Sequence, residues 1–180
     1  MTINANQSML LIIDLQTRLG PAIERIDDVL AHNRWLIEVA NALNVPVGAT
    51  VQYPQGLGPM EPALAALLPS QQRVEKIHFS AVADGCLPKL DGFDRPQIVL
   101  TGTETHVCVL QTALDLLQLG KSVYVVEEAV GSRRAQDKSL ALNRLQQAGC
   151  VIVSREMVAF EWLHRAGTET FRAISKRFIR

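Results

Sequence analysis

The stretch that decides the fold runs from Gln97 to Gly120 and reads QIVLTGTETHVCVLQTALDLLQLG. Residues 98–100 are an aliphatic run bounded by Pro96 and Gly102, which is typical of a buried parallel strand. After Gly102 the apolar residues recur at helical spacing, and Gly120 supplies a helix stop. The stretch therefore predicts a strand, a tight turn and a helix, in that order.

Cys108 lies close to the expected start of this helix. Thr105 is the natural N-cap, which would place Cys108 in the first turn, beside unpaired N–H groups and the positive end of the helix dipole. This position predicts a lowered pKa for the thiol, although the dipole alone shifts it by about one unit at most. An efficient nucleophile also needs a nearby cation or base, and without one Cys108 reads as a small buried apolar residue.

Length and composition limit the classes of protein. A chain of 180 residues fits one domain, spanning 1–180, and its 18 basic and 18 acidic residues cancel. No run of like charge exceeds two residues, so neither a nucleic-acid nor a membrane partner is expected. The first residues lack the features of a signal peptide, which predicts a cytoplasmic protein. Cys86, Cys108 and Cys150 show neither a disulfide framework nor a zinc pattern.

Strands and helices are expected to alternate along the whole chain. Apolar residues 9–13 end on Asp14, and further strands are expected at 45–51, 73–77, 98–100, 122–127 and 151–153. Helical periodicity follows most of them, including 136–148. This alternation predicts an α/β fold, namely a three-layer α/β/α sandwich around a six-stranded, doubly wound, Rossmann-like parallel sheet of order 3-2-1-4-5-6. DLQTR after the first strand replaces any glycine-rich phosphate loop, so no dinucleotide or other cofactor is expected.

The predicted strand order brings distant residues together. Strands one and four would be neighbours at the topological switch point, where ligands bind beyond the carboxyl ends of the strands. Asp14 ends strand one and Cys108 follows strand four, while Lys76 near the end of strand three opens onto the same edge. The sequence thus supplies a base and a cation for the thiol.

These residues lie in motifs that resemble the isochorismatase-like cysteine hydrolase superfamily. The motifs are LLIIDLQ with Asp14, VEKIHFS with Lys76 and GTETHVCV with Cys108. VQYPQGLGP and THVCVLQTALDL are most similar to the group called isochorismatase domain-containing proteins. The resemblance implies a catalytic triad of these three residues, a cis peptide bond between Thr103 and Glu104, and an oxyanion hole formed by the N–H groups of Glu104 and Cys108.

Further residues are candidates for the pocket. By their positions around the triad, the candidate lining residues are Gln16, Gln52, Tyr53, Phe79 and His106. Arg133 and His78 could each contact substrate or simply belong to a loop. The nicotinamidase branch of the superfamily holds a metal with an Asp-x-His motif after strand two, which residues 50–53 lack, so no metal site is expected.

Taken together, the residues and the resemblance predict a metal-independent cysteine hydrolase. It would cleave a small amide or related C–N or acyl substrate through an acyl-thioester. Two alternatives stay open, a non-catalytic binding or regulatory module on the same fold and, more weakly, a redox-sensing thiol protein. The expected helix after Cys108 carries two apolar faces, and the superfamily resemblance also implies homo-oligomers, so at least a dimer is expected.

Overall fold

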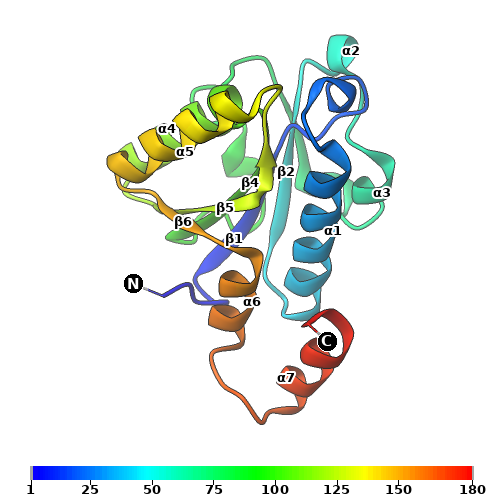
Figure 1. The fold of residues 1–180 in the computed structure, drawn as a ribbon, viewed down its shortest axis with the longest axis vertical. Helices are drawn as coiled ribbons and strands as arrows, with labels where there is room; N and C mark the ends of the chain where they lie inside the picture. Colours follow the sequence, from blue (N-terminus) through cyan, green and yellow to red (C-terminus); the bar gives the residue numbers. More distant parts are fainter. Residues whose placement is uncertain (1, 180) are drawn as a thin grey trace.

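The computed structural model describes residues 2–179 and has a six-stranded sheet at its centre (Figure 1). All strand pairs are parallel and the order is β3-β2-β1-β4-β5-β6, as predicted. The strands are β1 (Ser8–Ile13), β2 (Val47–Gln52), β3 (Arg73–Lys76), β4 (Gln97–Thr103), β5 (Ser122–Gly131) and β6 (Val151–Val153).

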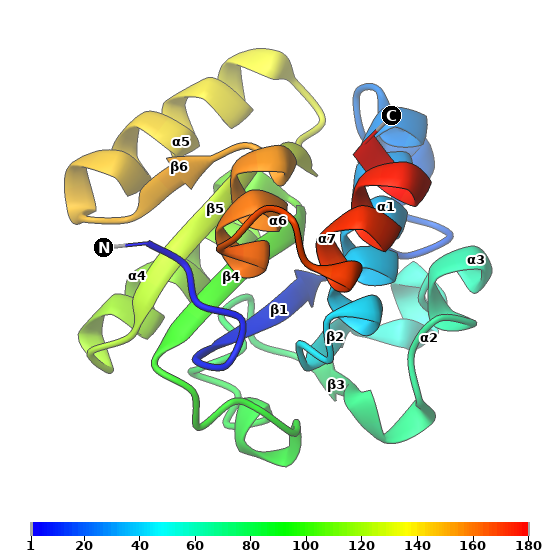
Figure 2. The ribbon, with the colours of Figure 1, turned by 90° about the horizontal axis from the view of Figure 1, so that it is seen from below.

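Helices cover both faces of the sheet, which makes the predicted three layers (Figure 2). α1 and α6 pack on one face, where Phe178 near the end of the chain contacts Trp35 of α1, and α4 and α5 pack on the other. The helices are α1 (Ile26–Ala42), α2 (Pro54–Leu57), α3 (Pro62–Ala65), α4 (Leu110–Gln118), α5 (Ala135–Ala148), α6 (Arg155–Leu163) and α7 (Glu169–Ile174). Short 3₁₀ turns lie at Gly20–Ala22, Ser70–Gln72 and Leu87–Lys89, and π-helical turns at Thr105–Val109 and Ser175–Ile179.

The central strands are apolar on both sides because each side meets a helical layer. In β1, Leu10 and Ile12 join the core beneath α1, whereas Leu11 and Ile13 join the core beneath α4. All four side chains are fully buried. This alternation explains why the strand reads as a continuous apolar run, and why the first charged residue of the chain, Asp14, marks the end of β1.

Gly102 is required where β4 passes β1. Its φ is +109°, and a Cβ built on it would lie 2.0 Å from the carbonyl oxygen and 2.5 Å from the nitrogen of Ile13. Both atoms belong to the main chain of the neighbouring strand, so they cannot give way to a side chain. This glycine therefore allows the backbones of β1 and β4 to approach where the candidate site begins.

We expect Gly102→Ala to lower the free energy of unfolding by about 3 kcal/mol or more, because it combines an unfavourable φ with a main-chain clash. Gly149→Ala is the matched control, since Gly149 has a φ of +110° and nothing within 4 Å of its Cβ position. It should cost about 1–2 kcal/mol. Urea unfolding measures both, and equal losses would contradict the proposed role of Gly102.

The structure departs from the sequence-based prediction at the start of the helix after β4. Thr105 does not cap the helix that follows β4, because its hydroxyl makes no hydrogen bond and the backbone first forms a π-helical turn. Cys108 therefore lies in this turn and not at the start of α4. Asp27 and Asp28 lie in the first turn of α1, and Arg25, at a φ of +54°, precedes that helix.

No helix within residues 2–179 is both long and apolar enough to cross a lipid bilayer.

Candidate active site

Asp14 lies at the carboxyl end of β1, where its side chain is fully buried. Its Oδ2 accepts a hydrogen bond from Lys76 Nζ at 2.8 Å, and its Oδ1 accepts one from Thr50 Oγ1 at 2.7 Å. The main chain is also fixed, because Thr103 Oγ1 donates to the Asp14 carbonyl oxygen at 2.8 Å. β1, β2, β3 and β4 together therefore hold one carboxylate in a fixed orientation.

Lys76 ends β3 and is 2% exposed. A buried ammonium group is costly unless every N–H is satisfied, and here Nζ faces four oxygen atoms. Besides Asp14, these are Gln52 Oε1 at 2.6 Å and the carbonyl oxygens of His78 at 3.2 Å and Phe79 at 3.0 Å. Lys76 is thus a fixed cation beside the Asp14 carboxylate.

Cys108 completes this group from the π-helical turn after β4. The residue is 7% exposed, and the side chains of both Asp14 and Lys76 are near enough to its thiol to influence its pKa. π-helical turns inside helical segments are often found at functional sites. The structure therefore brings together the three residues that the strand order was expected to unite.

The thiol pKa differs from the sequence-based prediction. Burial, followed by the negative charge of Asp14, raises the pKa of Cys108 to about 12, although Lys76 acts in the opposite direction. The predicted lowering by a helix dipole was wrong, because Cys108 does not occupy the first turn of an α-helix and its burial outweighs a dipole effect of about one unit. The resting thiol is protonated at neutral pH and needs a base during reaction.

The turn between β4 and Cys108 contains a cis peptide bond between Thr103 and Glu104. Within residues 2–179 the Glu104 N–H donates to no main-chain oxygen. The Glu104 carboxylate accepts a hydrogen bond from Arg133 Nε at 2.6 Å and lies 4.0 Å from His106 Nε2. His106 Nδ1 is 3.0 Å from Ser132 Oγ, so the His106 ring lies beside the residue that follows β5.

The four other candidate pocket residues divide into buried and exposed pairs. Gln16 and Gln52 are buried and hydrogen-bonded to each other, since the Gln16 side chain donates to the Gln52 carbonyl oxygen and accepts from the Gln52 N–H, each at 2.8 Å. Tyr53 is 52% exposed and Phe79 is 53% exposed, one after β2 and the other after β3. Gln52 contacts the triad directly through Lys76, whereas the two aromatic residues offer apolar surface at this edge of the sheet.

Sequence reasoning missed two contributors. Thr50 binds the second oxygen of Asp14, and its position directly opposite Ile13 in the β1–β2 register could have indicated it. Asp84 lies in the irregular segment after β3, where its Oδ1 accepts hydrogen bonds from the N–H groups of Ile77 at 2.8 Å and His78 at 3.0 Å. No periodic pattern marks such a loop contact.

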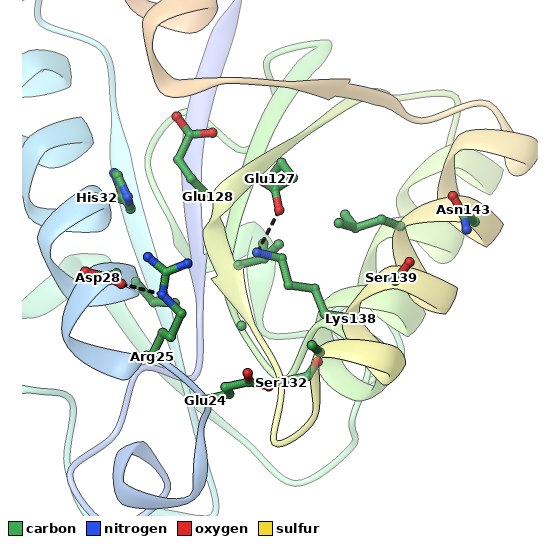
Figure 3. A pocket seen from close by; sticks show the side chains of 15 residues that line it. Glu24, Arg25, Asp28, His32, Glu127, Glu128, Ser132, Lys138, Ser139 and Asn143 are labelled. Atoms are coloured by element: carbon green, nitrogen blue, oxygen red, sulfur yellow. Dashed lines mark hydrogen bonds and ion pairs between the residues drawn. The ribbon is translucent and has the colours of Figure 1, made fainter.

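One cleft of the described residues lies apart from these side chains. It measures about 460 Å³ between the start of α1, the end of β5 and α5, and contains none of Asp14, Lys76 or Cys108 (Figure 3). Its charged walls are largely paired, because Arg25 bridges Asp28 at 2.7 Å and Lys138 bridges Glu127 at 2.9 Å. Ser132 lines this cleft, and its Oγ lies 3.0 Å from His106 Nδ1.

The arrangement of Asp14, Lys76 and Cys108 suits proton transfer from a thiol to a carboxylate. The Asp14 carboxylate can accept a proton, and the Lys76 ammonium group lies 2.8 Å from it as a counter-charge. Within residues 2–179 no cluster of three His, Cys, Asp or Glu side chains could hold a metal ion. A thiol, a carboxylate and an ammonium group can together supply nucleophilic and acid–base chemistry.

Comparison with known proteins gives consistent matches. Residues 8–157 match the sequence model of the Isochorismatase domain. Isochorismatase domain-containing protein 2A of Mus musculus is 36% identical over 94% of this chain and 81% of its own. The structure described as MAR1 ribonuclease from Caenorhabditis elegans is 32% identical, has a TM-score of 0.88, and is covered over 93% of its length by the whole of this chain.

A more distant structure shares the fold. The YcaC gene product of Escherichia coli, described as an octameric hydrolase of unknown specificity, has a TM-score of 0.90 at 23% identity, covering 99% of this chain and 91% of its own. The domain match extends over most of the chain and includes all three residues of the candidate site. The chain therefore belongs to the isochorismatase family, a family of hydrolase-like α/β proteins.

Proposed function

We propose that the protein is a metal-independent cysteine hydrolase of a small amide or related C–N or acyl substrate. The observation that carries this proposal is that the charges of the buried Asp14–Lys76 pair, joined at 2.8 Å, both act on the buried Cys108 thiol. A structural cysteine needs neither a base nor a cation beside it, and burying both charges without a function is costly. Membership in a family of hydrolase-like proteins agrees with this interpretation.

In the proposed first half-reaction, Cys108 Sγ attacks the carbonyl carbon as Asp14 accepts the thiol proton. The carbonyl oxygen becomes an oxyanion, for which the N–H groups of Glu104 and Cys108 are the proposed donors. Collapse of this intermediate restores the C=O bond and breaks the C–N bond. Asp14 returns its proton to the leaving nitrogen, so an amine departs and an acyl-thioester remains on Cys108.

The second half-reaction consumes one water molecule. Asp14, again ionised, accepts a proton as the water oxygen attacks the thioester carbonyl. The C–S bond then breaks, the acid product leaves, and the sulfur regains the proton held by Asp14. Lys76 keeps its charge throughout and holds the Asp14 carboxylate, to which it is bonded at 2.8 Å.

A substrate screen tests this function. The purified chain should release product from at least one compound in a panel of small amides, carbamoyl compounds and esters, and a chelator should leave the rate unchanged. If compounds of the panel bind but none is hydrolysed, the result would instead support a non-catalytic binding module. Loss of all turnover on chelation would contradict metal independence.

Two other functions receive less support. A redox-sensing thiol is typically exposed and of low pKa, whereas Cys108 is 7% exposed with a raised pKa. The Caenorhabditis elegans relative is described as a ribonuclease. RNA binding depends on basic residues that contact phosphates, and this chain has equal numbers of acidic and basic residues and no basic run longer than two.

We further propose that the protein is at least a dimer. The second apolar face of α4 is mostly covered within the chain, since Leu110 is buried and Leu114 and Leu117 pack against the core. The remaining support comes from exposed apolar residues beside the site, where Ile77 is 66% and Phe79 is 53% exposed. The Escherichia coli neighbour is described as octameric, although it shares only the fold.

Light scattering tests the assembly. We expect a mass of at least two chains, or about 40 kDa from a chain mass of 19.8 kDa, at micromolar concentration. Ile77→Lys should shift the mass toward one chain, because it introduces a charge into an apolar contact. A wild-type mass of one chain would contradict the proposal.

A further inference from the structure

The loop that follows β3 supplies half of the oxygen atoms around the Lys76 ammonium group. Nζ donates to the carbonyl oxygens of Phe79 at 3.0 Å and His78 at 3.2 Å. Gln52 reinforces the same arrangement, since it accepts from Nζ at 2.6 Å and donates through Nε2 to the Ile77 carbonyl at 2.6 Å. The position of the ammonium group therefore depends on how this loop is folded.

One carboxylate oxygen closes the loop. Asp84 Oδ1 accepts from the N–H of Ile77 at 2.8 Å, from the N–H of His78 at 3.0 Å, and lies 2.9 Å from His78 Nδ1. The far end of the loop is fixed separately, because Ser80 Oγ donates to Asp115 Oδ2 on α4 at 2.5 Å. Asp84 thus holds the N–H groups of Ile77 and His78, while the carbonyl groups of His78 and Phe79 face Lys76.

The Asp84 carboxylate is ionised throughout the neutral range. Its hydrogen bonds from His78 and Ile77 lower its pKa to about 2. Charge-assisted hydrogen bonds to a carboxylate are stronger than neutral ones, so the two main-chain contacts are the main restraint on the loop. The His78 ring contributes less, because its side chain is 65% exposed to water.

From this geometry we infer that Asp84 is a positioning residue, which sets the reactivity of Cys108 by fixing the loop carbonyls that hold Lys76. The inference rests on the proposed function for its biological meaning. Asp84 does not need to contact the substrate in this role, because it acts through two main-chain N–H groups and the Lys76 ammonium group. It goes beyond the triad by assigning a role to a loop residue 24 positions before Cys108.

Alkylation of the three cysteines tests the inference without any substrate. Burial raises the pKa of all three thiols. Beside burial, Lys76 acts to lower the pKa of Cys108, whereas for Cys86 the raising effect of the Asp84 charge exceeds the lowering effect of Lys76. Burial alone acts on the pKa of Cys150. We therefore expect iodoacetamide at mildly alkaline pH to label Cys108 at least about fivefold more slowly in Asp84→Ala than in the wild type. In the same variant Cys86 should be labelled faster, and Cys150 should be labelled at the wild-type rate. Peptide mass spectrometry resolves all three rates in one sample.

Two matched variants and one double variant separate positioning from a general loss of structure. Asp84→Asn keeps an acceptor oxygen for the two N–H groups, and His78→Ala keeps both N–H groups. In each of these variants Cys108 should therefore be labelled at close to the wild-type rate. Asp84→Ala should add nothing once Lys76→Met has removed the ammonium group. Faster labelling of all three cysteines in Asp84→Ala, or an additive effect with Lys76→Met, would overturn the inference.

This readout is independent of turnover. Suppose that no substrate is hydrolysed, but Cys108 is labelled more slowly, Cys86 faster and Cys150 at the wild-type rate. The positioning role then stands and the proposed hydrolase function fails. If hydrolysis is found but Cys108 labelling in Asp84→Ala equals that of the wild type, the hydrolase function stands and the positioning role fails.

Discussion

Replacing Cys108 with alanine should reduce hydrolysis of any substrate found for this protein by about a thousandfold or more, because it removes the only proposed nucleophile. The fold should survive. Cys108 is small and 7% exposed, so the loss of one sulfur atom should cost about 1 kcal/mol of unfolding free energy. Steady-state kinetics and urea unfolding on the same preparation measure the two effects.

Cys150→Ala is the matched control for this variant. Cys150 is also buried, at 3% exposure, but no charged group contributes to its raised pKa. It should lose a similar small amount of stability and retain full turnover. Undiminished hydrolysis by Cys108→Ala would contradict the mechanism, whereas equal loss of activity in both variants would point to a general effect of packing.

Asp14→Asn should have the second large effect, and its two consequences run in opposite directions. Turnover should fall by about 10²–10⁴-fold, because the amide cannot accept the thiol proton. The Cys108 thiol should nevertheless become easier to ionise, since the negative charge of Asp14 is one of the causes of its raised pKa while Lys76 still lowers it. The variant should therefore alkylate faster at Cys108 and hydrolyse more slowly.

Stability must be measured with this variant, because the substitution leaves Lys76 without its buried counter-charge. Breaking such a pair costs about 3–5 kcal/mol. The amide introduced by Asp14→Asn would keep the contact with Thr50, and Lys76 would keep Gln52 and two carbonyl oxygens. The alkylation rate of Cys150 again serves as the internal control, because a general loosening of the fold would raise it as well. Retained turnover would contradict a base role for Asp14. Slower alkylation of Cys108 with Cys150 unchanged would contradict the expected effect of the Asp14 charge on the thiol pKa.

Much of this fold could be predicted from local patterns. Residues 9–13 and 98–100 read as buried strands because both sides of β1 and β4 meet helices, so no polar side chain interrupts the run. Alternation with helices then determines a parallel sheet, and the observed strand order agrees with the doubly wound one. Gly102 was expected to permit a turn, but its close approach to the Ile13 backbone is a tertiary contact without a local signal.

The proximity of the main residues of the candidate site could be predicted from the sequence, but the direction of the Cys108 pKa shift could not. Asp14 and Cys108 could be brought together from strand order alone, because parallel strands one and four place their carboxyl ends side by side. The direction of the Cys108 pKa shift was missed since burial depends on packing that periodicity does not report. The Asp84 contacts were missed for the same reason, as they lie in the irregular loop after β3.

The central claim is that Cys108 carries the acyl group of the substrate during turnover. The most direct test is rapid acid quench of the enzyme with a turned-over substrate, followed by intact-mass and peptide mass spectrometry. The proposed mechanism predicts a mass increase equal to the acyl group, located on the peptide that contains Cys108, removed by hydroxylamine and absent from Cys108→Ala. Hydrolysis that continues in Cys108→Ala, or an acyl adduct on any other residue, would contradict it.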